Sequence, residues 1–237
     1  RQALETMRLW TRPHVENLQL IHEVEGMELF DEAIASGRGV IIAAPHYGNW
    51  ELLNQWLASR TPLSILYRAP ESNVGEAFLQ RVRKDPAHRV TQVRAEGPAV
   101  RQLFKRLRDG GVVGILPDQQ PKAGDGEFAA FFGVQALTMT LLPRLAARSD
   151  AIVLFAYCER IDNLQDARRA PAFRLRIEAA PADIHAPEPT RGVQALNSAI
   201  ERIARRDPAQ YQWTYKRYTL QPPGSARDNP YRDLERH

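Results

Sequence analysis

A polar stretch follows the first strongly apolar run of the chain and contains two side chains suited to acid–base chemistry. The stretch APHYGNWE holds His46 and Glu51 and comes directly after GVIIA. In an open α/β sheet, ligands collect at the carboxyl ends of strands, which is where His46 would lie. Gly48 allows the backbone to turn, and Asn49 is placed to cap the helix that begins there.

The spacing of His46 and Glu51 predicts a histidine base oriented by a carboxylate. Glu51 would lie in the first helical turn, from which it could reach one ring nitrogen of His46. That contact would fix the tautomer and leave the other nitrogen free to take a proton. This is a catalytic triad without its serine, and no G-x-S-x-G motif supplies one. The base is therefore expected to act on a hydroxyl brought by the substrate, as in acyl transfer to an alcohol.

A purely structural interpretation of the same residues stays open. His46 would then be a buried histidine with satisfied hydrogen bonds, and Glu51 a favourable charge at a helix N-terminus.

The rest of the chain alternates short apolar runs with longer helical patterns, which predicts a single α/β domain over 1–237 with a mostly parallel central sheet flanked by helices. Strands are expected at 39–44, 63–67, 112–116, 151–157 and 173–177. Helices are expected near 1–10, 27–36, 49–59, 74–84, 98–108, 136–147 and 191–205. Residues 1–25 are expected to form an N-terminal helical segment, and 222–237 a mobile tail.

Composition limits the classes of function. The net charge of +4 and pI near 9.4 suit an anionic partner but equally a solvated surface. The single cysteine, Cys158, and the lack of a Cys/His spacing give no indication of a disulfide or a metal site and favour a reducing compartment. The longest apolar runs are too short to cross a bilayer. No nucleic-acid motif accompanies the basic clusters at Arg101, Lys105, Arg106 and Arg108, and at Arg81, Arg83 and Lys84.

Five blocks of the sequence, in order, carry a family resemblance. PHYGNWE resembles the H-x-x-x-x-E motif of the bacterial lipid A late acyltransferases, the lauroyl/myristoyl family related to lysophospholipid acyltransferases. The other four blocks are YRAP at 67–70, LPDQQP at 116–121, GEFAAFFGVQA at 126–136 and PAQYQWTYKRY at 208–218. The resemblance spans about residues 25–220 and implies a fold like that of the glycerol-phosphate acyltransferases.

What this resemblance implies is transfer of a fatty acyl chain from acyl carrier protein to a hydroxyl of a lipid A precursor, with no cofactor. His46 would be the general base and Glu51 its orienting carboxylate. Backbone N–H groups of Gly48 and Asn49 are candidate donors to the oxyanion. The expected location is the cytoplasmic face of the bacterial inner membrane, held peripherally or through an anchor missing from this chain.

Three further candidates follow predicted strands. Arg68 would bind a phosphate or carboxylate, unless it is an ordinary surface arginine. Asp118 and Gln119 could hold Arg68 or bind substrate hydroxyls, and a cap or turn role is the alternative.

The last candidates are aromatic and basic. Phe131 and Phe132 could line an apolar groove for an acyl chain, although ordinary core is the simpler interpretation for each. Trp213, Lys216 and Arg217 would suit a lipid head group, or a strand or loop with a solvated face.

Two departures from the family pattern, Ala209 and Tyr215, suggest a different acceptor. Another lipid therefore stays open as the acceptor: a lysophospholipid, an ornithine lipid or a glycolipid. Two other functions also stay open, a non-catalytic module that binds lipid or carrier protein, and hydrolysis of the thioester by water.

Overall fold

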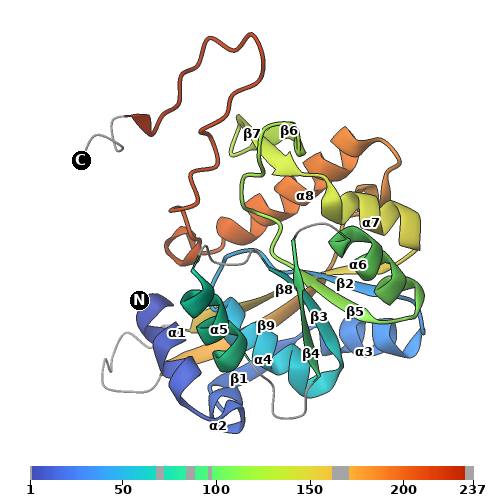
Figure 1. The fold of residues 1–237 in the computed structure, drawn as a ribbon, viewed down its shortest axis with the longest axis vertical. Helices are drawn as coiled ribbons and strands as arrows, with labels where there is room; N and C mark the ends of the chain where they lie inside the picture. Colours follow the sequence, from blue (N-terminus) through green and yellow to red (C-terminus); the bar gives the residue numbers. More distant parts are fainter. Residues whose placement is uncertain (1, 68–71, 84–88, 96–97, 162–170, 233–237) are drawn as a thin grey trace.

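The computed structural model describes residues 2–67, 72–83, 89–95, 98–161 and 171–232 and shows a central sheet with helices on both faces (Figure 1). In spatial order its strands are β1 (Ile21–Glu25), β9 (Ala172–Ala179), β8 (Ile152–Ile161), β2 (Val40–Ala43), β5 (Val112–Ile115), β3 (Leu63–Tyr67) and β4 (Val90–Arg94). The five strands from β8 to β4 run parallel, whereas β9 is antiparallel to β8. The predicted α/β class with a mostly parallel sheet is confirmed.

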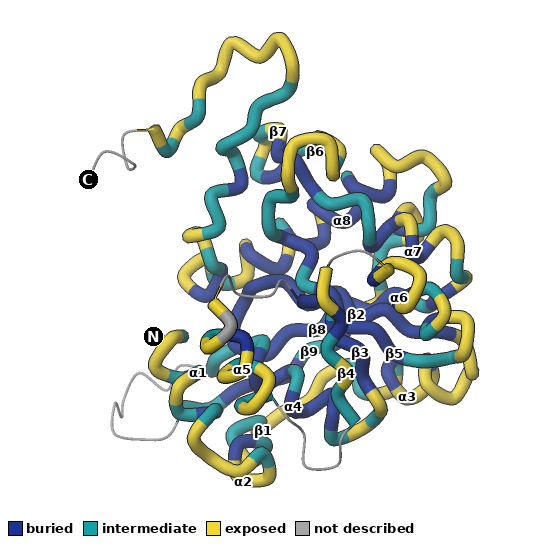
Figure 2. Tube along the Cα trace, in the orientation of Figure 1, coloured by how far each residue is buried: buried dark blue, intermediate teal, exposed yellow. Residues whose placement is uncertain are grey.

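Both faces of the sheet are covered because its central strands are apolar on both sides. In β2, Ile41 and Ala43 belong to one core cluster, and Val40 and Ile42 to the other. The first cluster packs against α6 (Ala99–Arg108), α7 (Leu141–Ser149) and α8 (Pro189–Ala204). The second packs against α1 (Gln2–Thr11), α3 (Met27–Ala35) and α4 (Trp50–Arg60), with α2 (His14–Leu18) beside α4. Figure 2 shows the central strands as the most buried part of the chain.

One further helix lies at the carboxyl edge of the sheet. Glu76 of α5 (Asn73–Val82) accepts a hydrogen bond from the hydroxyl of Tyr67, at the end of β3. The same carboxylate pairs with Arg94, at the end of β4. These bonds place α5 over the ends of the two strands.

Several elements differ from the sequence-based expectation. The predicted helix at 136–147 is wrong in its first part, because β6 (Gly126–Phe131) and β7 (Val134–Met139) form an antiparallel hairpin and α7 starts only at Leu141. Strands β1 and β4 were not expected, and β1 occupies the end of a segment predicted to be helical. Of the helices described, none has the length and apolar character needed to span a membrane.

The chain returns over the carboxyl edge of the sheet after α8. The short turn η1 (Ala182–His185) precedes α8, and η2 (Pro208–Gln210) follows it. After η2, Tyr211 forms a bridge with Tyr47. The peptide N–H of Gln212 donates to the carbonyl of His46 at 2.9 Å. Residues 222–232 then form a loop that extends away from the sheet (Figure 1) and brings Tyr231 back to the backbone of Arg217 and Tyr218. Mobility of this tail stays a prediction, and residues 233–237 lie outside the described part.

Candidate active site

Sheet register brings His46 together with Asp118. Strands β2 and β5 are parallel neighbours in which Ala43 is paired with Ile115. His46 and Asp118 each lie three residues beyond their strand's paired end. The two side chains therefore leave the same edge of the sheet at the same level, although 72 residues separate them in the chain.

Asp118 holds His46 by two hydrogen bonds. Nδ1 of the ring lies 2.6 Å from Oδ1, and the backbone N–H of His46 donates to Oδ2 at 2.8 Å. The side chains are 4% and 0% exposed, so water does not compete for either bond. Burial alone would raise the pKa of Asp118, but the charge and hydrogen bonds of His46, with a smaller effect of Arg217, hold that pKa below its ordinary value. An ionised Asp118 accepts the proton on Nδ1 and leaves Nε2 as the basic nitrogen.

Two aromatic rings cover the imidazole of His46. The ring of Trp50 lies 4.7 Å from it and that of Tyr215 lies 4.5 Å away, both edge to face. Burial raises the pKa of Tyr215, while a hydrogen bond with Gln119 opposes that change. The side chain of His46 is accordingly only 4% exposed in this structure. The structure thus places the predicted Gln119 beside His46, in contact with the ring of Tyr215, which packs against the imidazole.

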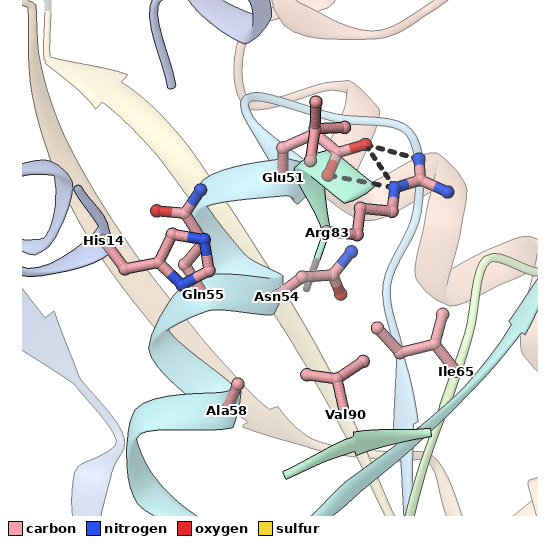
Figure 3. A pocket seen from close by; sticks show the side chains of 9 residues that line it. His14, Glu51, Asn54, Gln55, Ala58, Ile65, Arg83 and Val90 are labelled. Carbon is pink, nitrogen blue, oxygen red and sulfur yellow. Dashed lines mark hydrogen bonds and ion pairs between the residues drawn. The ribbon is translucent and has the colours of Figure 1, made fainter. Parts of the chain in front are cut away.

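Glu51 does not orient His46, which corrects the sequence-based expectation. Its carboxylate is bound by Arg83, whose Nε lies 3.1 Å from Oε1, with a second contact from Nη2 (Figure 3). Arg83 follows α5 and is better placed than the imidazole for a carboxylate in the first turn of α4. The carboxylate that contacts His46 is Asp118, which the sequence suggested as an arginine partner, a substrate ligand, or a cap or turn residue.

The cavity beside Glu51 is too small to hold a substrate. It has a volume of about 20 Å³ and lies between α4, the middle of β3 and the start of β4, with Asn54, Gln55 and Ile65 in its wall (Figure 3). A volume of about this size accommodates one water molecule. His46 is not part of its lining.

The expected oxyanion donors at Gly48 and Asn49 are occupied. The N–H of Gly48 donates to the carbonyl of Gln210 at 3.1 Å, and that of Asn49 to the carbonyl of Cys158 at 2.8 Å. Asn49 does cap α4, because its Oδ1 accepts from the N–H of Leu52 at 3.0 Å. Its Nδ2 is buried and makes no hydrogen bond with the described residues.

Arg217 is a buried cation and not a surface ligand for a head group. It is 4% exposed, its guanidinium lies 4.7 Å from the ring of Phe131, and Nη2 donates to Thr138 at 2.9 Å and to Asn197 at 3.2 Å. Its Nε and Nη1 find no acceptor among the described residues. The hydroxyl of Tyr211 interacts with both this cation and Asp118, and burial raises the pKa of that hydroxyl.

The two phenylalanines are not shown to line a groove. Phe131 is fully buried in the core. Phe132 stacks under the guanidinium of Arg205 at 4.6 Å and against Trp213 at 5.3 Å. Trp213 is 48% exposed and remains a surface aromatic, while Lys216 is partly buried. The expected anion ligand Arg68 lies outside the described residues.

A larger hollow lies between α6 and α7. Its volume is about 900 Å³, and five cations line it: Arg101, Lys105, Arg108, Arg144 and Arg148. Lys105 is paired with Asp109 at 2.6 Å, and Asp125 and Glu127 also border the hollow. Arg106 of the predicted basic cluster points elsewhere, to the carbonyl of Pro62.

Sequence reasoning missed Arg83, Trp50, Tyr211 and Tyr215 as parts of the site. Arg83 appeared only as one cation of a basic cluster, and Tyr215 only as a departure from a family pattern. No local pattern could have identified Arg83, Tyr211 and Tyr215, because each depends on a contact between distant segments. Trp50 is only four residues from His46, so its contact with the imidazole is local.

Comparison with known proteins gives a consistent family. The family described as "Bacterial lipid A biosynthesis acyltransferase" matches residues 1–219. A Haemophilus influenzae lipid A biosynthesis acyltransferase is 24% identical over 83% of this chain and 59% of its own length. An Escherichia coli lipid A biosynthesis palmitoleoyltransferase is 23% identical over 94% of this chain and 69% of its own. A Mycobacterium tuberculosis phosphatidylinositol mannoside acyltransferase is 28% identical over 65% of this chain and 49% of its own. The chain thus spans about half to two thirds of the length of these relatives.

Proposed function

Since the chain belongs to the bacterial lipid A biosynthesis acyltransferase family, we propose that it is an O-acyltransferase that moves a fatty acyl chain from a thioester to a hydroxyl of a lipid A precursor. The donor is acyl carrier protein, and the reaction takes place at the cytoplasmic face of the inner membrane. The observation that carries the proposal is the buried pair of His46 and Asp118 at the carboxyl edge of the sheet.

In this mechanism His46 is the general base and Asp118 its positioning residue. Nε2 of His46 takes the proton of the acceptor hydroxyl as the oxygen attacks the thioester carbonyl. Asp118 stabilises the imidazolium that forms. The tetrahedral intermediate then breaks its C–S bond, and the imidazolium returns the proton to the departing thiolate. The product is an ester, and the thioester already carries the activation that the reaction needs.

The oxyanion donors in this proposal lie two residues further along than Gly48 and Asn49. Leu52 and Leu53 donate their N–H groups to Asn49. The N–H groups of Trp50 and Glu51 have no acceptor within the helix because they lie in its first turn. They point out of the N-terminus of α4, where the helix dipole favours a negative charge.

Glu51 acts in this proposal through Arg83. The buried carboxylate of Glu51 holds the guanidinium of Arg83 in place. This guanidinium lies close enough to Tyr215 to affect the pKa of its hydroxyl. A fixed guanidinium there suits a phosphate of the acceptor or of the donor's prosthetic arm. Glu51 would then set the affinity for substrate more than the basicity of His46.

The hollow between α6 and α7 is the proposed docking surface for the carrier protein. Its five cations outnumber its three acidic neighbours, which suits an acidic protein. Charge reversal at Arg144 and Arg148 should raise the KM for the carrier-protein thioester and leave transfer from a small acyl thioester unchanged.

A second acceptor class is favoured by one comparison. The phosphatidylinositol mannoside acyltransferase has slightly higher identity than the lipid A enzymes, although over less of the chain. A related glycolipid is therefore the alternative acceptor. Mass spectrometry of lipids from a deletion strain decides between the two: loss of one acyl chain from lipid A supports the first, and an unchanged lipid A with an altered glycolipid supports the second.

The proposal is tested by purified transfer assays with acyl carrier protein thioester and lipid acceptor. His46→Ala should abolish ester formation while the thermal unfolding curve is retained. Transfer by His46→Ala at the wild-type rate would refute the role of His46 as the base. A wild-type chain that binds lipid or carrier protein but forms no ester would be a binding module. Release of free fatty acid in the absence of acceptor would instead indicate a thioesterase.

A further inference from the structure

Two neighbouring helices carry apolar side chains on their outer faces. Leu4 and Met7 of α1 are 73% and 60% exposed, and Val74 and Phe78 of α5 are 79% and 50% exposed. The rings of Trp10 and Phe78 meet edge to face at 5.4 Å, so the two faces form one surface. We call these five residues the α1–α5 patch; the two helices lie side by side in Figure 1, with exposed stretches in Figure 2.

Each helix turns charged groups inward while it leaves these apolar groups outside. Glu5 of α1 pairs with Arg160 through bonds of 2.7 and 2.6 Å, and both side chains are nearly buried. Among the residues of α5 that the structure describes, Glu76 is buried. Its Oε1 accepts hydrogen bonds from the hydroxyl of Tyr67 at 3.0 Å and from Nε of Arg94 at 2.8 Å. In α1 the apolar Leu9 is also buried, as in an ordinary surface helix, but Leu4 and Met7 remain on the outer face. The apolar outer face therefore indicates an apolar partner.

The patch lies next to the candidate active site. Arg83, directly after α5, binds Glu51 in the first turn of α4. On the other side, the N–H of Arg160 donates to the side chain of Gln210 at 2.7 Å, and the carbonyl of Gln210 accepts from Gly48. Both helices are thus attached to the segments that surround His46.

We propose that the α1–α5 patch inserts into the surface of a membrane that contains anionic lipid. The patch is formed by two outward helices, and its ends carry exposed cations, Arg12 after α1 and Arg81 in the last turn of α5. Apolar side chains with an aromatic ring and flanking arginines match the interface of an anionic bilayer, with each cation adding electrostatic attraction. The inference deepens the proposed function, on which it rests for the lipid acceptor, because insertion here would bring the bilayer beside His46.

The test is flotation of the purified 237-residue chain with vesicles of phosphatidylcholine, alone or mixed with phosphatidylglycerol. The wild type should float with the anionic vesicles and be released by salt. The double variant Met7→Ser/Phe78→Ser should partition at least about tenfold more weakly, since two large apolar groups are lost. Val100→Ser is the matched control, because Val100 is 51% exposed on α6, outside the patch, and its change should alter binding by less than about threefold. Thermal unfolding confirms that each variant is folded.

A charge variant supplies the second arm. Arg12→Gln/Arg81→Gln should weaken binding to the anionic vesicles and leave weak binding to phosphatidylcholine unchanged. Vesicle binding of the Met7→Ser/Phe78→Ser variant equal to that of the wild type would overturn the proposal. So would light scattering that shows a wild-type dimer lost in that variant, since the patch would then bind a second copy.

The readouts keep this inference separate from the proposed function. The patch variant should still transfer acyl chains to a detergent-dispersed acceptor, whereas His46→Ala should float normally without transferring. A wild-type chain that floats but never forms an ester refutes the proposed function and supports the patch.

Discussion

Replacing Asp118 with asparagine tests the proposed catalytic pair directly. Asp118 accepts from both Nδ1 and the backbone N–H of His46, at 2.6 and 2.8 Å. An asparagine has one oxygen for these two donors, so its NH₂ group must face one of them. If it faces the ring, Nδ1 becomes the acceptor, the proton moves to Nε2, and the base is lost.

The expected loss follows from the burial of the pair. Both side chains are at most 4% exposed, so no solvent replaces the missing charge-assisted bond. Removing a general base typically costs about 10²- to 10⁴-fold in rate, and the wrong tautomer has a comparable effect. We expect kcat to fall by about 10³-fold, which corresponds to about 4 kcal/mol of transition-state stabilisation.

Single-turnover transfer from the carrier-protein thioester, followed across neutral pH, measures this loss. Glu51→Gln is the control variant, because Glu51 is bound to Arg83 and not to the imidazole. It should raise KM more than it lowers kcat and leave the acid limb of the rate profile in place. The reasoning fails if Asp118→Asn keeps a rate within about tenfold of wild type, or if the acid limb moves in Glu51→Gln.

Three further changes test the surroundings of the site. Burial would raise the pKa of Glu159, but hydrogen bonds from Arg206, Tyr47 and Arg176 lower it. The carboxylate therefore stabilises the fold above its unfolded pKa of about 4.3, and this stability is lost as pH falls through the folded pKa. Glu159→Gln should make the unfolding free energy fall less steeply at acid pH. Burial also raises the pKa of the Cys158 thiol, so iodoacetamide should label it in urea but not in the native protein, and rapid native labelling would contradict its burial. Gly48 has φ +63, and an added Cβ would lie 2.0 Å from the carbonyl oxygen of Cys158, whereas Gly124 has φ +89 and open space around it. Calorimetry should show a much larger loss of stability for Gly48→Ala than for Gly124→Ala. Equal losses would mean that backbone strain alone, and not the clash with Cys158, determines the cost at Gly48.

The elements that the sequence predicted well are those whose burial is uniform. The run that forms β2 is buried at every position, and Gly39 and Pro45 bound it. β1 and β4 are mostly exposed or half-buried, with charged or polar residues in their sequences, so they lack the apolar pattern that identifies a strand. The hairpin was missed because its turn places Phe132 at φ +49, a conformation that a phenylalanine rarely adopts.

Local sequence also determined the start of α4. Asn49 is followed by residues with helical potential, and its side chain needs only the N–H of Leu52, three positions on, to form the cap. The placement of His46 just after a buried strand was predictable for the same reason, since both features depend on neighbours in the chain.

Which carboxylate serves His46 was decided only by the tertiary structure. Glu51 is close in sequence, but Arg83, 32 residues away, binds it. Asp118 is distant in sequence, yet the pairing of Ala43 with Ile115 brings it level with His46. Strand order and register result from the packing of the whole sheet, and the spacing of residues within one segment contains no record of them.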